Sequence, residues 1–262
     1  MLRNARQLGN FVVQATDGEL GTLDQLYFDD ETWAIRYLTV AMGWLGSRRV
    51  LISPISVTHV DWIDKMLDVA LTKSQVENSP NIDTDKPVSR QHEIEFSGYY
   101  GYPCYWGGPF LWGPVYYPDA VRTAPKDEVA ERIKSKSIDS HLRSTKAVTG
   151  YHLEATNGEL GHVDGFIVDD EAWALRYIEV ATKNWWPGKK VLVSPAWIER
   201  VSWEDSKVYV DLSREAIQSA PEFLDFTQIT RDYEHKLYSH YGRPPYWLHE
   251  AEFRPSLSLS GV

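Results

Sequence analysis

Sulfur, positive charge and long apolar runs are all scarce in this chain of 262 residues. Its one cysteine, Cys104, excludes an intramolecular disulfide and any metal site built from several thiolates. The net charge of −10 argues against non-specific binding to nucleic acid or an anionic membrane, because both need a basic surface. No apolar run follows Met1-Leu2-Arg3, so we expect no signal peptide and a cytoplasmic protein.

The sequence also lacks the motifs that are typical of catalytic, phosphate-binding and metal-binding sites. It has no Gly-rich phosphate loop, and Cys104 has a distant histidine, His92, without a third group to hold that base. His235 and His240 are five residues apart, which is not the spacing of a helical metal pair. The turn Asp29-Asp30-Glu31 lacks the alternating ligands of a calcium loop. We therefore expect no enzyme activity, no cofactor and no metal.

The longest uncharged stretch, Ser97 to Pro118, has the length of a membrane span. It contains four prolines and five glycines, and such a backbone cannot satisfy its own hydrogen bonds in lipid. We expect no transmembrane segment, although peripheral membrane association stays open.

What the chain does contain is an internal repeat. Asp29 to Tyr37 returns as Asp169 to Tyr177 with seven of nine residues identical, at an offset of 140. After a one-residue insertion in a Gly/Trp/Pro stretch, which indicates a loop, the offset becomes 141. Tyr100 to Trp106 then returns as Tyr241 to Trp247 with five of seven identical.

Within each unit the pattern predicts short strands. Asp17-Gly18 and its counterpart Asn157-Gly158 favour hairpins with type I′ turns. Further strands are expected over 33–42, 49–52, 57–62 and 66–71, and over their counterparts in the second unit. A short helix with a Thr72/Gln75 capping box closes the first unit, and one with a Ser213 cap closes the second. Five or six strands in about 75 residues favour a small closed barrel.

These observations divide the chain into two barrels and two extensions. The expected fold class is mainly β, with short helices and aromatic Gly/Pro-rich extensions. The predicted boundaries are 1–80 for the first barrel, 81–141 for an aromatic linker with an exposed helix at 125–134, 142–221 for the second barrel and 222–262 for a C-terminal aromatic extension.

The order of motifs in each unit resembles the PRC-barrel family. The shared features are Leu-Arg, a strand, Asp-Gly-Glu-x-Gly or its Asn counterpart, an acidic turn, Arg-Tyr and a strand ending in Ser-Pro. This domain occurs in the cytoplasmic part of the photosynthetic reaction-centre H subunit and in the ribosome maturation factor RimM. The resemblance covers about three fifths of the chain and implies a small barrel that docks onto other macromolecules and shares no catalytic residues. We expect neither the membrane helix of the first protein nor the additional domain of the second.

Several repeated residues are expected to be structural. Arg36 and Arg176 lie in mid-strand, where we expect a partly buried guanidinium paired with an acid such as Asp24 or Asp164, or stacked on a ring. The structural set is Gly18, Gly21, Trp33, Arg36, Gly158, Gly161, Trp173 and Arg176.

The aromatic residues outside the barrels are the candidate interaction surface. Tyrosine and tryptophan give large contact areas at low entropic cost, so these rings serve either a binding surface or a cover for the barrels. The candidates are Tyr99, Tyr100, Tyr102, Tyr105, Trp106, Phe110, Trp112, Tyr116, Tyr117, Tyr241, Tyr246 and Trp247.

Three functions remain open on the sequence alone. The first is a non-catalytic protein-interaction or assembly module, expected to be a homodimer with an unknown protein partner. The second, which the resemblance implies, is an H-subunit-like accessory of membrane electron transport or photosynthesis. The third is a small-ligand or enzymatic role in an aromatic cleft between the barrels. Nucleic acid is not expected as a partner, because both units are net acidic.

Overall fold

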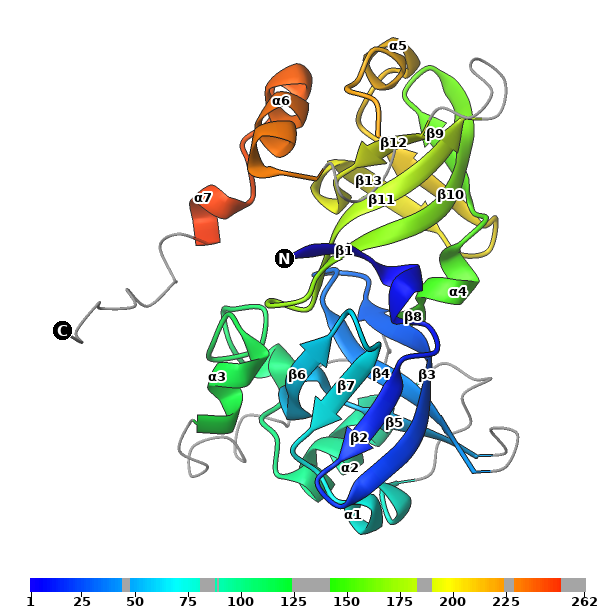
Figure 1. The fold of residues 1–262 in the computed structure, drawn as a ribbon. Coiled ribbons are helices and arrows are strands. Elements are labelled where there is room, and N and C mark those ends of the chain that lie inside the picture. Colours follow the sequence, from blue (N-terminus) through cyan, green and yellow to red (C-terminus); the bar gives the residue numbers. More distant parts are fainter. Residues whose placement is uncertain are drawn as a thin grey trace, which may run out of the picture.

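The computed structural model describes residues 1–43, 48–80, 88, 90–123, 142–182, 190–223 and 229–250. The repeat insertion and the exposed helix predicted at 125–134 lie outside these residues. Two β-rich halves lie end to end, and the N-terminal strand lies at their junction (Figure 1).

The first half contains β1 (Leu2–Asn4), η1 (Ala5–Leu8), β2 (Val12–Ala15), β3 (Gly18–Asp29), β4 (Ile35–Met42), β5 (Arg48–Ile52), η3 (Pro54–Ser56), β6 (Val57–Asp61), β7 (Met66–Val69), α1 (Lys73–Glu77), α2 (Arg90–Tyr100), η4 (Tyr105–Gly107) and α3 (Pro118–Thr123). The second half contains β8 (Leu142–Ser144), α4 (Thr145–Val148), β9 (His152–Ala155), β10 (Gly158–Asp169), β11 (Ala174–Thr182), β12 (Lys190–Val193), η7 (Pro195–Trp197), β13 (Ile198–Ser202), β14 (Lys207–Val210), α5 (Arg214–Gln218), α6 (Arg231–Tyr241) and α7 (Trp247–Glu250).

Each half is built on a seven-stranded sheet, which confirms a mainly β fold. The strand order is β5-β4-β3-β2-β7-β6 in one sheet and β12-β11-β10-β9-β14-β13 in the other. Neighbours are antiparallel except β2 with β7 and β9 with β14, which are parallel. Among the described residues the end strands of each path do not pair with each other, so the sheets stay open. The predicted closure into barrels is therefore not confirmed.

The seventh strand of each sheet comes from the opposite half. β1 pairs with β10, with Leu2 opposite Asp169, and β8 pairs with β3, with Leu142 opposite Asp29. The two units thus exchange their first strands reciprocally, as the subunits of a domain-swapped dimer do. One continuous hydrophobic core includes residues of both halves, and Phe28 meets Phe166 across the junction with ring centroids 5.9 Å apart.

Two tryptophans fix the centre of the junction. Trp33 and Trp173 have φ of 59° and 51°, a left-handed conformation that is costly for a bulky residue. Their carbonyls accept hydrogen bonds from the opposite half: Leu175 N–H donates to Trp33 at 2.8 Å and Ile35 N–H donates to Trp173 at 2.7 Å. These reciprocal bonds hold the strained turns, which explains why Trp33 lies in a turn and the predicted strand begins only at Ile35.

The predicted hairpins and caps form, with one correction. Neither Asp17 nor Asn157 has the positive φ that a type I′ turn requires, whereas Gly18 and Gly158 have φ of 130° and 132°, so the prediction of type I′ was wrong for both turns. The capping box of Thr72 and Gln75 and the Ser213 cap are confirmed. A Cβ on Gly21 would lie 2.1 Å from the Ala41 carbonyl oxygen, which explains the glycine there.

Helices α2 and α6 were not predicted, because the aromatic content of these segments was interpreted as extended chain. In α6, Thr230 accepts from Tyr233 N–H as the N-cap, and Gly242 ends the helix with φ of 62°. The helix α2 packs Phe96 against Tyr37 of β4, with ring centroids 5.0 Å apart. β4 is consequently buried on both faces, which fits its nearly continuous apolar sequence.

Candidate interaction site

The twelve candidate aromatic residues lie mostly against the sheets rather than in solvent. Tyr105 and Trp112 are buried, Tyr99 is exposed, and the nine others are half-buried. Burial of this kind matches a cover for the sheets. Any binding surface must then be formed by residues that these aromatic rings do not cover.

Trp112 is the most deeply inserted of these rings. Its side chain is 2% exposed, and its indole Nε1 donates to the Ala172 carbonyl of the opposite half at 3.0 Å. The Arg36 guanidinium carbon lies 5.0 Å from the Trp112 ring centroid, and Arg36 Nη1 donates to the Leu111 carbonyl. Residues 111 and 112 therefore join a strand of the first half to the junction.

The two repeated arginines are structural, but their acidic partners differ from those predicted. Arg36 lies 3.7 Å from Asp29, and Arg176 lies 2.9 Å from Asp169. Asp24 lies at a bulge beside residues 39 and 40 of β4, several residues from Arg36 along the strand, and it pairs with Lys146 at 2.6 Å. The predictions of Asp24 and Asp164 were therefore wrong, because they ignored register.

Stacking of the arginines on rings is confirmed. The Arg36 guanidinium carbon is 3.7 Å from the Tyr105 ring centroid, and that of Arg176 is 4.3 Å from the Tyr246 centroid. Burial lowers the pKa of Arg36 from its ordinary value, although Tyr105 and Asp29 oppose this shift. Each arginine thus ties an acidic turn to an aromatic extension.

A second repeated feature is a buried glutamate that accepts from two tyrosines. Tyr177 and Tyr246 donate to Glu234 Oε1 at 2.7 and 3.0 Å. Tyr37 and Tyr105 contact Glu93 Oε1 in the same way, at 3.3 and 2.7 Å. We call these the Tyr–Glu–Tyr clusters; each fastens a helix, α2 or α6, to its sheet.

In the Tyr–Glu–Tyr cluster of Glu234, burial is the largest influence on the pKa values. It raises the pKa of Glu234 above its usual value, and it raises the pKa of Tyr246 far above that of a free phenol. The glutamates were missed in the sequence. The repeat continues upstream of Tyr100 at offset 141, and the identity of Glu93 with Glu234 was the available signal.

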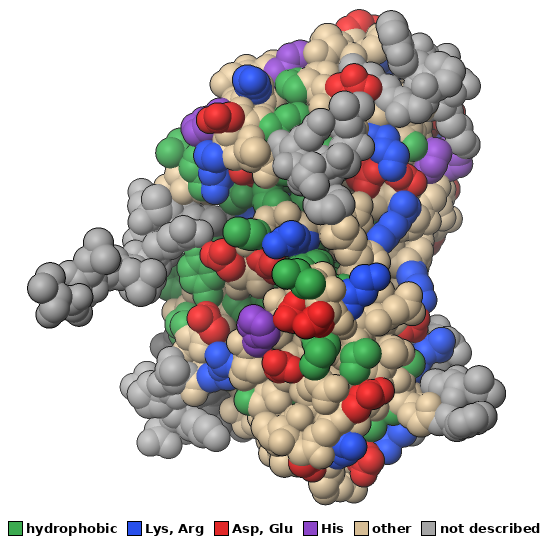
Figure 2. All heavy atoms as spheres, in the orientation of Figure 1, with side chains coloured by type: hydrophobic (Ala, Val, Ile, Leu, Met, Phe, Trp, Pro, Cys, Tyr) green, Lys and Arg blue, Asp and Glu red, His purple; other side chains and the backbone are tan. Residues whose placement is uncertain are grey.

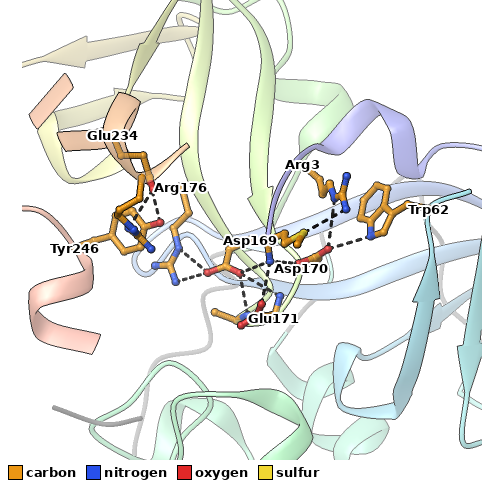
Figure 3. A network of polar contacts seen from close by, with 11 residues as sticks. Arg3, Trp62, Asp169, Asp170, Glu171, Arg176, Glu234 and Tyr246 are labelled. Carbon is orange, nitrogen blue, oxygen red and sulfur yellow. Dashed lines mark hydrogen bonds and ion pairs between the residues drawn. The ribbon is translucent and has the colours of Figure 1, made fainter. Parts of the chain in front are cut away.

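The acidic turns connect the exchanged strands to the hairpins of the opposite half. Trp62 Nε1 donates to Asp170 Oδ2 at 3.0 Å, and Arg3 lies 3.9 Å from the same carboxylate (Figure 3). The guanidinium carbon of Arg3 is also 4.9 Å from the Trp62 ring centroid.

Asp169, on the other side of this turn, faces Arg176. Burial alone would raise the pKa of Asp169, but the Arg176 guanidinium holds it below its usual value. In the other half, Arg143 donates to Asp30 at 3.0 Å and stacks on Trp203, with 4.3 Å from guanidinium carbon to ring centroid.

An open cleft of about 760 Å³ lies between the halves. One wall is the turn Asp30–Trp33 with Arg143 of the exchanged strand β8. The other wall comes from η7 and β13, and Arg176 and Tyr246 also line the cleft. This volume is within the range of small-molecule and peptide pockets.

The three arginines of the cleft are already paired or stacked. Arg143 contacts Asp30, Arg176 contacts Asp169, and the guanidinium carbon of Arg200 lies 3.5 Å from the Tyr209 ring centroid. The lining combines aromatic rings with charged side chains of both signs, so the cleft does not concentrate charge of one sign. On the face of the molecule in Figure 2, acidic and basic side chains are likewise interspersed.

Two further searches cover the residues that the structure describes. No helix among them has both the length and the apolar character needed to cross a membrane. In the same residues, no three or more His, Cys, Asp or Glu side chains are grouped so that they could hold a metal ion. The acidic turn instead caps itself, since Asp29 Oδ1 accepts from Glu31 N–H at 2.9 Å.

No model of a known protein family matches this chain, and no curated protein matches it.

Proposed function

We propose that this chain is a non-catalytic protein-interaction or assembly module of the cytoplasm, built from two PRC-type units. The observation that carries the proposal is the cleft between Trp33 and Trp203, because both halves contribute to it. Reciprocal strand exchange holds its two walls in one body, so the cleft is preorganised for a ligand. Its lining of aromatic rings beside arginines and acidic side chains suits a protein segment better than an anion.

Crosslinking in the native cell, followed by mass spectrometry, tests this function. We expect the full chain to be crosslinked repeatedly to the same partner, with crosslinked peptides from around β13 or the turn at residues 30–33. A chain that is always recovered free of other proteins, even after crosslinking, contradicts the proposal. Sedimentation of the purified chain tests the expected homodimer separately.

A small flat ligand is the second candidate, favoured by Trp33, Trp203 and Tyr246 in the lining of the same cleft. A saturating ligand that binds only the folded state raises the midpoint of thermal unfolding. Metabolite screens that include sugars and flat ring compounds are the direct test. If no compound shifts the midpoint, the small-ligand function is excluded for the compounds screened.

A further inference from the structure

Two histidines lie directly opposite each other in the hairpin of β9 and β10. The antiparallel register pairs His162 of β10 with His152 of β9. His152 N–H donates to the Ser206 carbonyl on the side of β14 at 2.9 Å, and Val163 N–H donates to the Tyr151 carbonyl at 2.8 Å. The two histidines therefore form a non-hydrogen-bonded pair, in which the Cα atoms are about 4.5 Å apart. Both side chains of such a pair lie on the same face of the sheet.

This face of the hairpin is turned away from the hydrophobic core. Leu153 and Val163, which follow the two histidines along β9 and β10, have 0% exposure and belong to the core. Successive side chains of a strand point to opposite faces, so His152 and His162 point outward. The side chain of His152 is 44% exposed and His162 is half-buried. Solvent therefore reaches the pair at least at His152.

The hydrogen bonding of the two rings favours a bound cation. Glu159 Oε1 lies 3.2 Å from Nδ1 of His152, and a carboxylate there favours the tautomer that leaves the Nε2 lone pair for a ligand. In His162, Nδ1 is buried and has no hydrogen-bond partner among the described residues. An unpaired buried nitrogen is costly, and coordination to a metal ion would satisfy it.

The charged side chains that flank the pair in the sheet have a net negative charge. Glu154 lies opposite Glu159 in the β9–β10 register, and Lys207 of β14 lies opposite His152. Lys207 Nζ is already paired with Glu154 Oε1 at 2.8 Å. Two carboxylates beside one ammonium favour a cation over an anion on this face.

We propose that His152 and His162 bind a divalent transition-metal ion, and that Glu159 positions the His152 ring. Imidazole nitrogens are ligands for Zn²⁺, Cu²⁺ and Ni²⁺, and directly opposite Cβ atoms about 4.5–5.5 Å apart allow two rings to converge on one ion. Two imidazoles fill half of a tetrahedral zinc sphere and leave the other positions to water or to a group from another molecule. Such a two-histidine site differs from the groups of three or more side chains that the described residues lack. Neither histidine lines the cleft, so this site does not depend on the proposed interaction function.

The repeat supplies the replacement residues for a test. Val12 and Thr22 hold the equivalent positions at offset 140, and they pair in the same register in the first half. Both are β-branched residues that suit a strand, so His152→Val and His162→Thr should leave the sheet folded.

Titration calorimetry of the full chain with Zn²⁺, without a histidine tag, measures the site. We expect one ion to bind at this pair, and each of His152→Val and His162→Thr should weaken its binding at least about 10-fold, because even the loss of an outer-shell partner commonly costs that much. Glu159→Gln should weaken binding about 10-fold without changing the number of ions bound. His59→Ala is the matched control, since His59 is an exposed histidine of β6 in the other half and should not affect this ion.

A second measurement needs no variant and so does not depend on how the variants fold. Electron paramagnetic resonance of one equivalent of Cu²⁺ bound to wild type should show coupling to two imidazole nitrogens. A spectrum without two such nitrogens contradicts the site. Absence of Zn²⁺ binding at about 1 mM metal, or equal binding by wild type and the His152→Val/His162→Thr double variant, overturns the proposal.

Discussion

Replacing Trp112 measures how firmly the aromatic segment is built into the junction. The side chain is 2% exposed and donates to Ala172 at 3.0 Å. Large-to-small replacement of a buried tryptophan costs about 3–5 kcal/mol of unfolding free energy, so Trp112→Ala should lose that amount. Trp112→Phe keeps most of the ring contact but loses the N–H donor, and should lose about 1 kcal/mol beyond the change in packing.

The assay is urea denaturation followed by far-UV circular dichroism, because eleven tryptophans make the fluorescence signal hard to assign. Ile63→Ala is the control, and at 92% exposure it should change stability by no more than about 0.5 kcal/mol. If Trp112→Ala costs no more than this control, the ring does not stabilise the junction.

Three other predictions test the packing, the titration and the connection of the halves. Gly21→Ala and Gly161→Ala should each lower the free energy of unfolding, measured by urea denaturation, by about 1–3 kcal/mol, because each new Cβ would lie 2.1 Å from a carbonyl oxygen. Gly98→Ala in α2 should raise it by up to about 1 kcal/mol, because no atom lies within 4 Å of the new Cβ and alanine favours the helix. Burial raises the pKa of Glu234, so the folded state keeps that proton to higher pH than the unfolded chain and stability falls as pH rises above 4.5. Glu234→Gln should therefore gain stability relative to wild type as the pH rises above 4.5, and a difference in stability that stays constant with pH contradicts the assignment. Cleavage at a protease site inserted in residues 124–141 should leave two fragments that co-elute in size-exclusion chromatography, because β1 and β8 are each paired with the sheet of the opposite half. Fragments that separate without denaturant would disprove the strand exchange.

The strands and caps could be predicted because they depend on local sequence. Residues 49–52 are β-branched or aliphatic in three of four positions, and Thr72 with Gln75 forms the capping box that its spacing indicates. The strand exchange depends on which sheet the first strand joins. That choice is set by contacts between residues more than a hundred positions apart, such as Leu2 with Asp169, and a periodic pattern carries no information on it.

The candidate site was predictable in part for the same reason. Arg36 and the aromatic extension were identified, because they recur in both units. The pairing of Arg36 with Asp29 rather than Asp24 depends on a bulge in the β3–β4 register, which shifts side chains by one residue. The helices around Glu93 and Glu234 were missed, since tyrosine and histidine are weak helix formers and the packing of these helices on the sheets outweighs that preference.

The reciprocal exchange of β1 and β8 gives one polypeptide the architecture of a two-fold dimer. In a dimer of identical chains, every substitution appears at both symmetry-related sites, so two equivalent sites must change together. Joining the two units in one chain removes that constraint, and each site can acquire its own residues. The two units differ at equivalent positions, where Thr32 corresponds to Ala172 and Ala196 corresponds to Ile55. A symmetric dimer of identical chains could not have such differences. A single chain of this design can insert its own tryptophan, Trp112, on one side of the junction and carry different residues on the other.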